Sequence, residues 1–234
     1  MSFHTRLKYM LLSYYPKPIA ATETGYSKYR EGISETTHGK YIPRLFCEYF
    51  RLGIKLTYIY DFVDEYNDAN KSNREANYGL VRRDLSPKPG YLALKSLVSL
   101  LKDAVDGFSP RSLKYKLLIK EFGTYNRTYY VNHILLQKRD GDFYFLFWHE
   151  ISSEDTSVVP HRQIIHHMPA KLKFSQSIKQ AIVYTYDDSW NLIPKDIPVV
   201  DNVICFEVPD QLIRYSFDAR SIVHWSSKKS FLLM

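Results

Sequence analysis

Glu23 and Asp61 are the residues of this sequence best placed for chemistry, because each directly follows a short apolar segment. Glu23 comes after Ile19–Thr22, and Asp61 comes after Ile54–Tyr60; both segments read as strands. If the strands are parallel, as in an α/β barrel, a carboxylate at the carboxyl end points toward the mouth. There it can act as a nucleophile or as a general acid or base. The structural alternative for Glu23 is a salt bridge with a neighbouring strand or a cap on the next helix.

The elements that would position these carboxylates alternate along the first 102 residues. Apolar residues recur at helical spacing over Phe3–Tyr14, and a second helix is expected from Ser34, as N-cap, to Leu52. A third helix is expected over Gly90–Leu101. The resulting order is helix–strand–helix–strand–helix, and such alternation predicts parallel strands joined by crossover helices.

The pattern changes after Asp106, where short strand-like segments recur. They are expected at 114–120, 129–137, 143–150, 163–167, 171–174, 181–186, 203–208 and 213–217. Many short strands separated by turn residues predict an antiparallel β-sandwich. With a linker at 103–110, the expected fold class is α/β plus all-β, with domains at 1–104 and 111–234.

Composition excludes several classes of protein. The net charge is +7, but the densest basic runs are the pairs Arg82–Arg83 and Lys228–Lys229, which argues against nucleic-acid binding. No apolar run approaches the ~20 residues of a membrane span. The first 15 residues lack the features of a signal peptide, so localisation stays open. Cys47 and Cys205 have no metal-type spacing, so we expect neither a metal nor a cofactor.

The sequence around Glu23 resembles a known enzyme family. Thr22–Tyr26 is similar to the seventh, nucleophile-bearing strand of clan A glycoside hydrolases, which are retaining enzymes built on (β/α)8 barrels. Three later segments resemble, in the same order, the following helix, the eighth strand with its loop, and the segment that closes the barrel: Lys40–Ile54, Thr57–Glu65 and Gly79–Leu94. Leu135–Gly141 and Phe143–Glu150 look like the accessory β-domain of some of these enzymes. The resemblance implies the last two βα units of such a barrel, followed by an antiparallel β-sandwich domain.

The resemblance also implies roles for individual residues. Glu23 would be the catalytic nucleophile, and Asp61 would contact the substrate. Three tyrosines could line a sugar subsite, although packing in the core or in a loop is an equal alternative for each: Tyr26, Tyr58 and Tyr60.

The second catalytic carboxyl group is the missing part of this constellation. In the family, the acid/base glutamate follows an asparagine on the fourth strand, and no Asn-Glu dipeptide occurs in this sequence. The candidates near Glu23 are Asp61, Asp64 and Glu65, and none is favoured as the acid. Asp64 and Glu65 are expected in a polar surface loop, with a surface or metal-tolerant role.

The sequence therefore predicts part of a retaining glycoside hydrolase acting on a glycan, with the nucleophile present and the acid/base half of the site missing. Such a chain is expected to be inactive alone. The apolar face of the helix ending at Leu52, with Phe46 and Phe50, needs a neighbour: the β-domain, a second copy, or a complementing barrel portion. The alternative is a non-enzymatic carbohydrate-binding or interaction module built on the β-sandwich. For that module, Trp148 is expected in the core, and Trp190, in a turn, is the candidate for stacking on a sugar.

Overall fold

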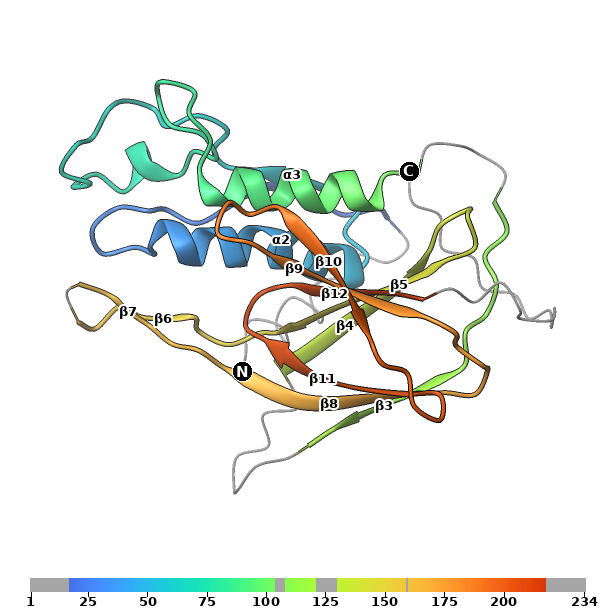
Figure 1. Ribbon diagram of the computed structural model, residues 1–234. Coiled ribbons are helices and arrows are strands. Elements are labelled where there is room, and N and C mark those ends of the chain that lie inside the picture. Colours follow the sequence, from blue (N-terminus) through green and yellow to red (C-terminus); the bar gives the residue numbers. More distant parts are fainter. Residues whose placement is uncertain (1–16, 104–107, 121–129, 159, 218–234) are drawn as a thin grey trace. The chain divides into compact units, whose positions relative to one another are not determined.

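The computed structural model describes residues 17–103, 108–120, 130–158 and 160–217 (Figure 1). The chain has mixed α/β content, with few helices and several sheets. It forms two compact units, of which the first comprises Met1–Leu94 with Ser153–Ile164 and the second comprises Lys95–Ser152 with Ile165–Met234. The helix expected at Phe3–Tyr14 lies outside the described residues.

The first unit contains a strand–helix–strand element with parallel strands, as the alternation predicts. Strand β1 (Ala20–Thr24) pairs with β2 (Leu56–Ile59), and helix α2 (Glu35–Arg51) connects them. Local signals set the ends of α2, because the Ser34 side chain accepts a hydrogen bond from the Thr37 amide and Gly53 follows the helix with a φ of 85°. Pro43 lies inside the helix.

The remainder of the first unit consists of a long loop, a 3-10 helix, a pair of short strands and the start of a helix. After β2, the chain forms the 3-10 helix η1 (Glu75–Asn77) and then enters helix α3 (Pro89–Leu101). The boundary between the two units falls within α3. The strands β6 (Glu154–Asp155) and β7 (Arg162–Gln163) form an antiparallel pair that belongs to this unit.

Hydrogen bonds fix the β6–β7 pair to α2. The Glu154 carboxylate accepts a hydrogen bond from the Ser34 amide at 2.9 Å. Its negative charge is also favourable there, because the amino end of a helix carries a partial positive charge. The Ser153 amide donates to the Tyr41 hydroxyl at 2.9 Å, and the Gln163 side chain donates to the Thr37 hydroxyl at 3.1 Å.

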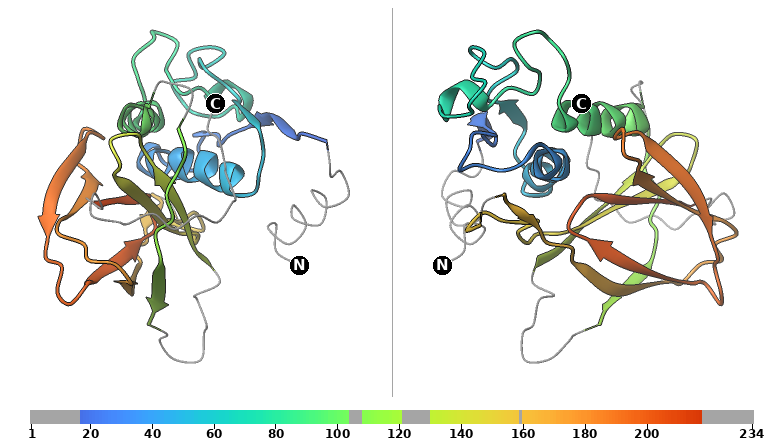
Figure 2. Two further views of the ribbon diagram at one scale, coloured as in Figure 1. Left: turned by 90° about the vertical axis from the view of Figure 1, so that its right-hand side faces the viewer. Right: turned by 60° about the vertical axis from the view of Figure 1, so that its left-hand side comes forward.

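The second unit is built from two antiparallel sheets. The larger has the order β10-β9-β12-β5-β4, and the smaller has the order β11-β8-β3. Figure 1 shows the three strands of the smaller sheet side by side, and Figure 2 shows β9 and β10 as a hairpin. The strands span Tyr115–Ile119 (β3), Val131–Gln137 (β4), Phe143–His149 (β5), His167–Phe174 (β8), Ala181–Tyr186 (β9), Leu192–Ile197 (β10), Val203–Pro209 (β11) and Ile213–Phe217 (β12).

One hydrophobic core is shared by both sheets of this unit. Phe145 and Phe147 of β5 stack on each other with ring centroids 5.4 Å apart, and Leu172 of β8 and Ile204 of β11 belong to the same buried cluster. Every residue of β5 is buried, so both faces of this strand are covered. Trp148 is fully buried, which confirms its expected place in the core.

Among the described residues, no helix is long and apolar enough to cross a membrane. Cys47 is buried and Cys205 is exposed, and both are free thiols.

Candidate functional site

The carboxyl ends of β1 and β2 lie at the same edge of their sheet, as parallel pairing requires. Thr24 is aligned with Ile59, and beyond that pair the Tyr60 amide donates to the Thr24 carbonyl at 2.7 Å. Glu23 and Tyr60 therefore both sit at the end of the sheet where parallel α/β proteins place functional residues.

Gly25 allows these two strand ends to approach closely. A Cβ at this position would lie 2.1 Å from the Tyr60 carbonyl oxygen, a distance that backbone atoms cannot accommodate. Only glycine fits this contact, because it lacks the side chain that would push the two segments apart. Gly25 thus allows the segments that follow β1 and β2 to lie in direct contact.

Glu23 is exposed on β1. Within the ranges that the structure describes, its carboxylate forms no hydrogen bond or ion pair. It therefore neither bridges a neighbouring strand nor caps a helix there, and the two structural alternatives from the sequence are absent.

The predicted substrate-contacting residues have different surroundings. Tyr58 is exposed, and Asp61 accepts a hydrogen bond from the Phe62 amide at 2.5 Å. The Tyr60 hydroxyl donates to the Glu65 carboxylate at 3.2 Å, and this interaction raises the pKa of the tyrosine. Tyr26 packs edge-on against the ring of Tyr41 on α2, with centroids 5.2 Å apart. This contact fits the packing role that was the alternative to a sugar subsite.

Asp64 is buried, so the expectation that it lies on a polar surface was wrong. Its carboxylate accepts hydrogen bonds from the Gly79 amide at 2.9 Å and from the Lys88 amine at 2.6 Å. The error arose because the polar residues around Asp64 suggested a solvated loop, whereas Lys88 reaches it from 24 positions later.

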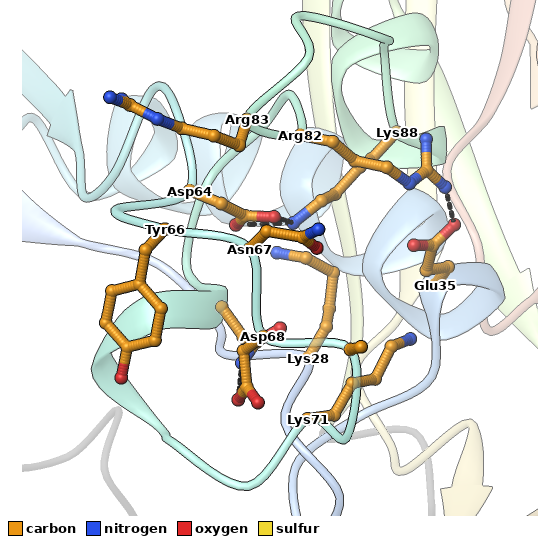
Figure 3. Close-up of a pocket in the computed structure, with 12 residues that line it drawn as sticks. Lys28, Glu35, Asp64, Tyr66, Asn67, Asp68, Lys71, Arg82, Arg83 and Lys88 are labelled. Carbon is orange, nitrogen blue, oxygen red and sulfur yellow. Dashed lines mark hydrogen bonds and ion pairs between the residues drawn. The ribbon is translucent and has the colours of Figure 1, made fainter.

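A pocket of about 190 Å³ adjoins this ion pair in the first unit. Figure 3 shows Asp64 and Lys88 joined on one side of it, with Arg82 joined to Glu35 on another. The Lys28 amine lines the same pocket. Its residues come from the loop after β1, from the amino end of α2 and from the long segment between β2 and α3.

Lys28 is the most deeply buried lysine of this pocket, and no sequence pattern distinguishes it from other loop residues. Its amine donates to the Gly79 carbonyl at 2.9 Å and lies 3.4 Å from Nε2 of His38. Burial, followed by the charge of Lys88, lowers the pKa of Lys28 from 10.5 to about 6. Burial and the same two lysines also lower the pKa of His38.

Gly79 and Gly90 are the close-packed backbone positions around this cluster. A Cβ on Gly79 would lie 2.2 Å from the Asp64 amide nitrogen, and a Cβ on Gly90 would lie 2.3 Å from Nδ1 of His38. Because the ring of His38 is fully buried, it has no free space to move into. These glycines therefore let the loop and α3 pack directly on the Asp64 backbone and on the His38 ring.

No group of three or more metal-ligating side chains is present among the residues whose positions are described.

No protein-family model matches the chain, and no curated protein matches it either. Similar structures do occur among glycoside hydrolases. A family 39 glycoside hydrolase from the gut symbiont Bacteroides cellulosilyticus WH2 has a TM-score of 0.54 and 16% identity, over 86% of this chain and 34% of that chain. The family 39 enzyme from Xanthomonas axonopodis pv. citri has a TM-score of 0.46 and 13% identity, over 92% and 47% of the two chains. A family 30 endoxylanase from Clostridium papyrosolvens C71 has a TM-score of 0.43 and 11% identity, over 86% and 42%.

The chain spans about a third to a half of the length of these enzymes. At such low identity, similarity is informative about the fold and not about activity. The chain thus shares its fold with part of a family 39 glycoside hydrolase.

Proposed function

We propose that this chain is the nucleophile-bearing part of a retaining glycoside hydrolase that acts on a glycan. In this proposal β1 and β2 are the seventh and eighth strands of a (β/α)8 barrel. The segment 1–104 is the partial barrel, and the two antiparallel sheets of 111–234 form an accessory β-sandwich domain. The fold shared with part of a family 39 glycoside hydrolase supports the proposal.

The observation that carries the proposal is the incomplete burial of the β1–β2 sheet. The sheet has two strands, so within the described part of the chain each strand has one unpaired edge. Leu56 and Tyr58 of β2 are both 55% exposed. Parallel sheets are normally covered on both faces and extended by further strands. The exposed face and the free edges are what two strands taken from a closed barrel would present.

The chemistry assigned to Glu23 is attack on the anomeric carbon of a sugar. A retaining mechanism also needs a second carboxyl group ~5–5.5 Å away, which protonates the leaving oxygen. The three candidates within the chain have other partners: Asp61 accepts from the Phe62 amide, Asp64 binds Lys88, and Glu65 accepts from Tyr60. We therefore assign the acid/base to a complementing barrel portion.

Without that portion, the chain would have no useful turnover of natural glycans. Loss of general acid/base catalysis alone removes a factor of ~10²–10⁴ in rate. The remaining barrel strands would also form most of the substrate cleft. Self-association is the other way in which the exposed sheet could be covered.

The alternative function, carbohydrate binding by the β-sheet unit alone, receives no support from its aromatic residues. Trp148 is buried in the core. Trp190 is half-buried, and its ring packs against Tyr186 with centroids 5.5 Å apart. In the described part of this unit, Tyr130 is the aromatic residue that is substantially exposed, so no row of aromatic platforms is present.

The direct test compares the purified chain with its Glu23→Gln variant on a panel of aryl β-glycosides and polysaccharides. We expect no turnover of the polysaccharides by either protein. Turnover of the polysaccharides by the wild-type chain that is lost in Glu23→Gln would show that an acid/base is present within the chain, and the assignment of that group to another portion would then be wrong.

A further inference from the structure

The pocket beside Asp64 has an excess of basic side chains. Its walls carry five basic residues and three acidic ones. The basic residues are Lys28, Lys71, Arg82, Arg83 and Lys88. Such an excess attracts anions, provided that the acidic groups do not already neutralise the cations.

Each of the three carboxylates is already engaged. Asp64 is bound to Lys88, and Glu35 is bound to Arg82 at 2.5 Å. Asp68 organises its own loop: it accepts hydrogen bonds from the Asn73 amide at 2.8 Å and from other groups of the same loop, and these bonds lower its pKa.

Three basic side chains remain without a carboxylate partner among the described residues, namely Lys28, Lys71 and Arg83. Lys28 and Lys71 approach the pocket from neighbouring segments, because the Arg30 amide donates to the Lys71 carbonyl at 2.7 Å (Figure 3). The Arg83 side chain extends away from the centre of the group of residues in the figure.

We propose that this pocket is a binding site for a small oxyanion, such as a sulfate or phosphate group, held chiefly by the amines of Lys28 and Lys71. An oxyanion offers several acceptor oxygens to these amines and supplies the negative charge that the local carboxylates do not. The site is independent of the proposed glycosidase role, since it uses neither Glu23 nor the residues at the ends of β1 and β2.

The protonation of Lys28 gives this proposal a distinctive signature. Four titratable groups face the Lys28 amine, which also donates to the Gly79 carbonyl. Lys88 acts through its charge and a hydrogen bond, Asp64 and Glu35 act through their charges, and a ring nitrogen of His38 lies beside the amine. With its pKa at about 6, Lys28 is mostly neutral at pH 7 in the empty pocket. A bound anion favours the charged amine, so binding at pH 7 should be accompanied by uptake of about 0.8–0.9 proton if the bound-state pKa exceeds 8.

The experiment is isothermal titration calorimetry of the full chain with sodium sulfate at constant ionic strength, in two buffers that differ in ionisation enthalpy. Sulfate is chosen because it does not titrate near neutral pH, so proton uptake reports on the protein. We expect saturable binding with proton uptake, and affinity that falls by up to about tenfold per pH unit between pH 6 and 8.

Lys28→Met should weaken sulfate binding by about tenfold or more and abolish the proton uptake. This variant should remain folded, because it removes a buried amine rather than adding one. Lys71→Met should also weaken binding but leave the proton uptake unchanged. Lys55→Met is the matched control, since Lys55 is exposed in the same unit and does not line the pocket, and it should have no effect.

Two further ligands identify the source of the anion. If glucose 6-sulfate binds more tightly than sulfate and glucose does not bind, the natural ligand is an anion carried by a sugar. Equal affinities for glucose 6-sulfate and sulfate would indicate a free anion. The proposal is overturned if neither sulfate nor glucose 6-sulfate gives saturable binding. It is also overturned if binding is insensitive to Lys28→Met or occurs without proton uptake.

Discussion

Asp64→Asn tests whether the buried pair of Asp64 and Lys88 holds the loop after β2 in place. The two side chains are 11% and 3% exposed, and the Asp64 carboxylate also accepts from the Gly79 amide. Asparagine retains an oxygen for the Gly79 amide but leaves the Lys88 ammonium without a countercharge. Breaking a buried pair in this way typically costs 3–5 kcal/mol.

The chemistry of lysine sets an upper limit on this loss. In the variant, Lys88 can lose its proton instead of remaining charged, which at pH 7 costs about 4.6 kcal/mol relative to an ordinary lysine. We therefore expect a loss of about 3–5 kcal/mol in the free energy of unfolding at pH 7. Where Lys88 is neutral in the folded variant, the deficit should shrink by about 1.4 kcal/mol per pH unit. It should shrink until the pH reaches the wild-type pKa of Lys88, which burial holds below its ordinary value.

The assay is urea unfolding at pH 7 and pH 9, monitored by circular dichroism, with Glu35→Gln as the matched control. Glu35 pairs with Arg82, but their side chains are 28% and 40% exposed, so its replacement should cost no more than about 1 kcal/mol. If the two units unfold separately, the loss should appear in the transition of the first unit. A loss below about 1 kcal/mol for Asp64→Asn, or equal losses for both variants, would refute the reasoning.

Three further substitutions test other parts of the first unit. In the wild-type protein the low folded-state pKa of Lys28 makes stability rise between about pH 6 and 10.5, and the cost of burying the charged amine is largest below pH 6. Lys28→Met should therefore increase stability most at low pH. A pH-independent effect in urea unfolding from pH 5 to 10 would contradict this. Replacement of glycine by alanine normally stabilises a helix, but in Gly90→Ala the new Cβ would lie 2.3 Å from the His38 ring. We therefore expect a destabilisation of about 1–3 kcal/mol. A higher melting temperature would show that the contact can relax. Replacing both Leu56 and Tyr58 by serine should change stability by no more than about 0.5 kcal/mol per site while reducing any self-association seen by analytical ultracentrifugation; a large loss of stability would mean that this face is covered in the folded chain.

The sequence was most informative where local signals determine the structure. The start of α2 follows from the Ser34 side chain, and its end follows from Gly53, which adopts a backbone conformation that favours glycine. The parallel pairing of β1 with β2 follows from the alternation of elements.

The sequence was least informative where distant segments meet. Lys28 reads as a loop residue, and its burial depends on Gly79, which follows 51 positions later. The return of residues 153–164 to the first unit was also not predictable, because that packing includes a hydrogen bond from the Ser34 amide to Glu154 across 120 positions. Strand β10 was missed because Pro194, a lysine and an aspartate interrupt its apolar pattern.

The candidate site shows the same division. A strand followed by a carboxylate pointed to Glu23, and the structure places that residue at the carboxyl end of β1. The spacing of single residues could not reveal that Asp64 pairs with Lys88 or that both line a pocket. Charged residues in loops look alike in a sequence, and their burial is decided by which segments fold over them.

The most direct test of the proposed nucleophile uses a dinitrophenyl β-glycoside, whose leaving group departs without a proton from a general acid. In the presence of azide as a second nucleophile, we expect slow release of dinitrophenolate and formation of the β-glycosyl azide by the wild-type chain and not by Glu23→Gln. We expect no hydrolysis of unactivated glycans by either protein. The assignment of Glu23 as the nucleophile would be contradicted if dinitrophenolate release is absent from the wild-type chain or persists in Glu23→Gln. The claim that the acid/base lies outside this chain would be contradicted by Glu23-dependent hydrolysis of an unactivated glycan.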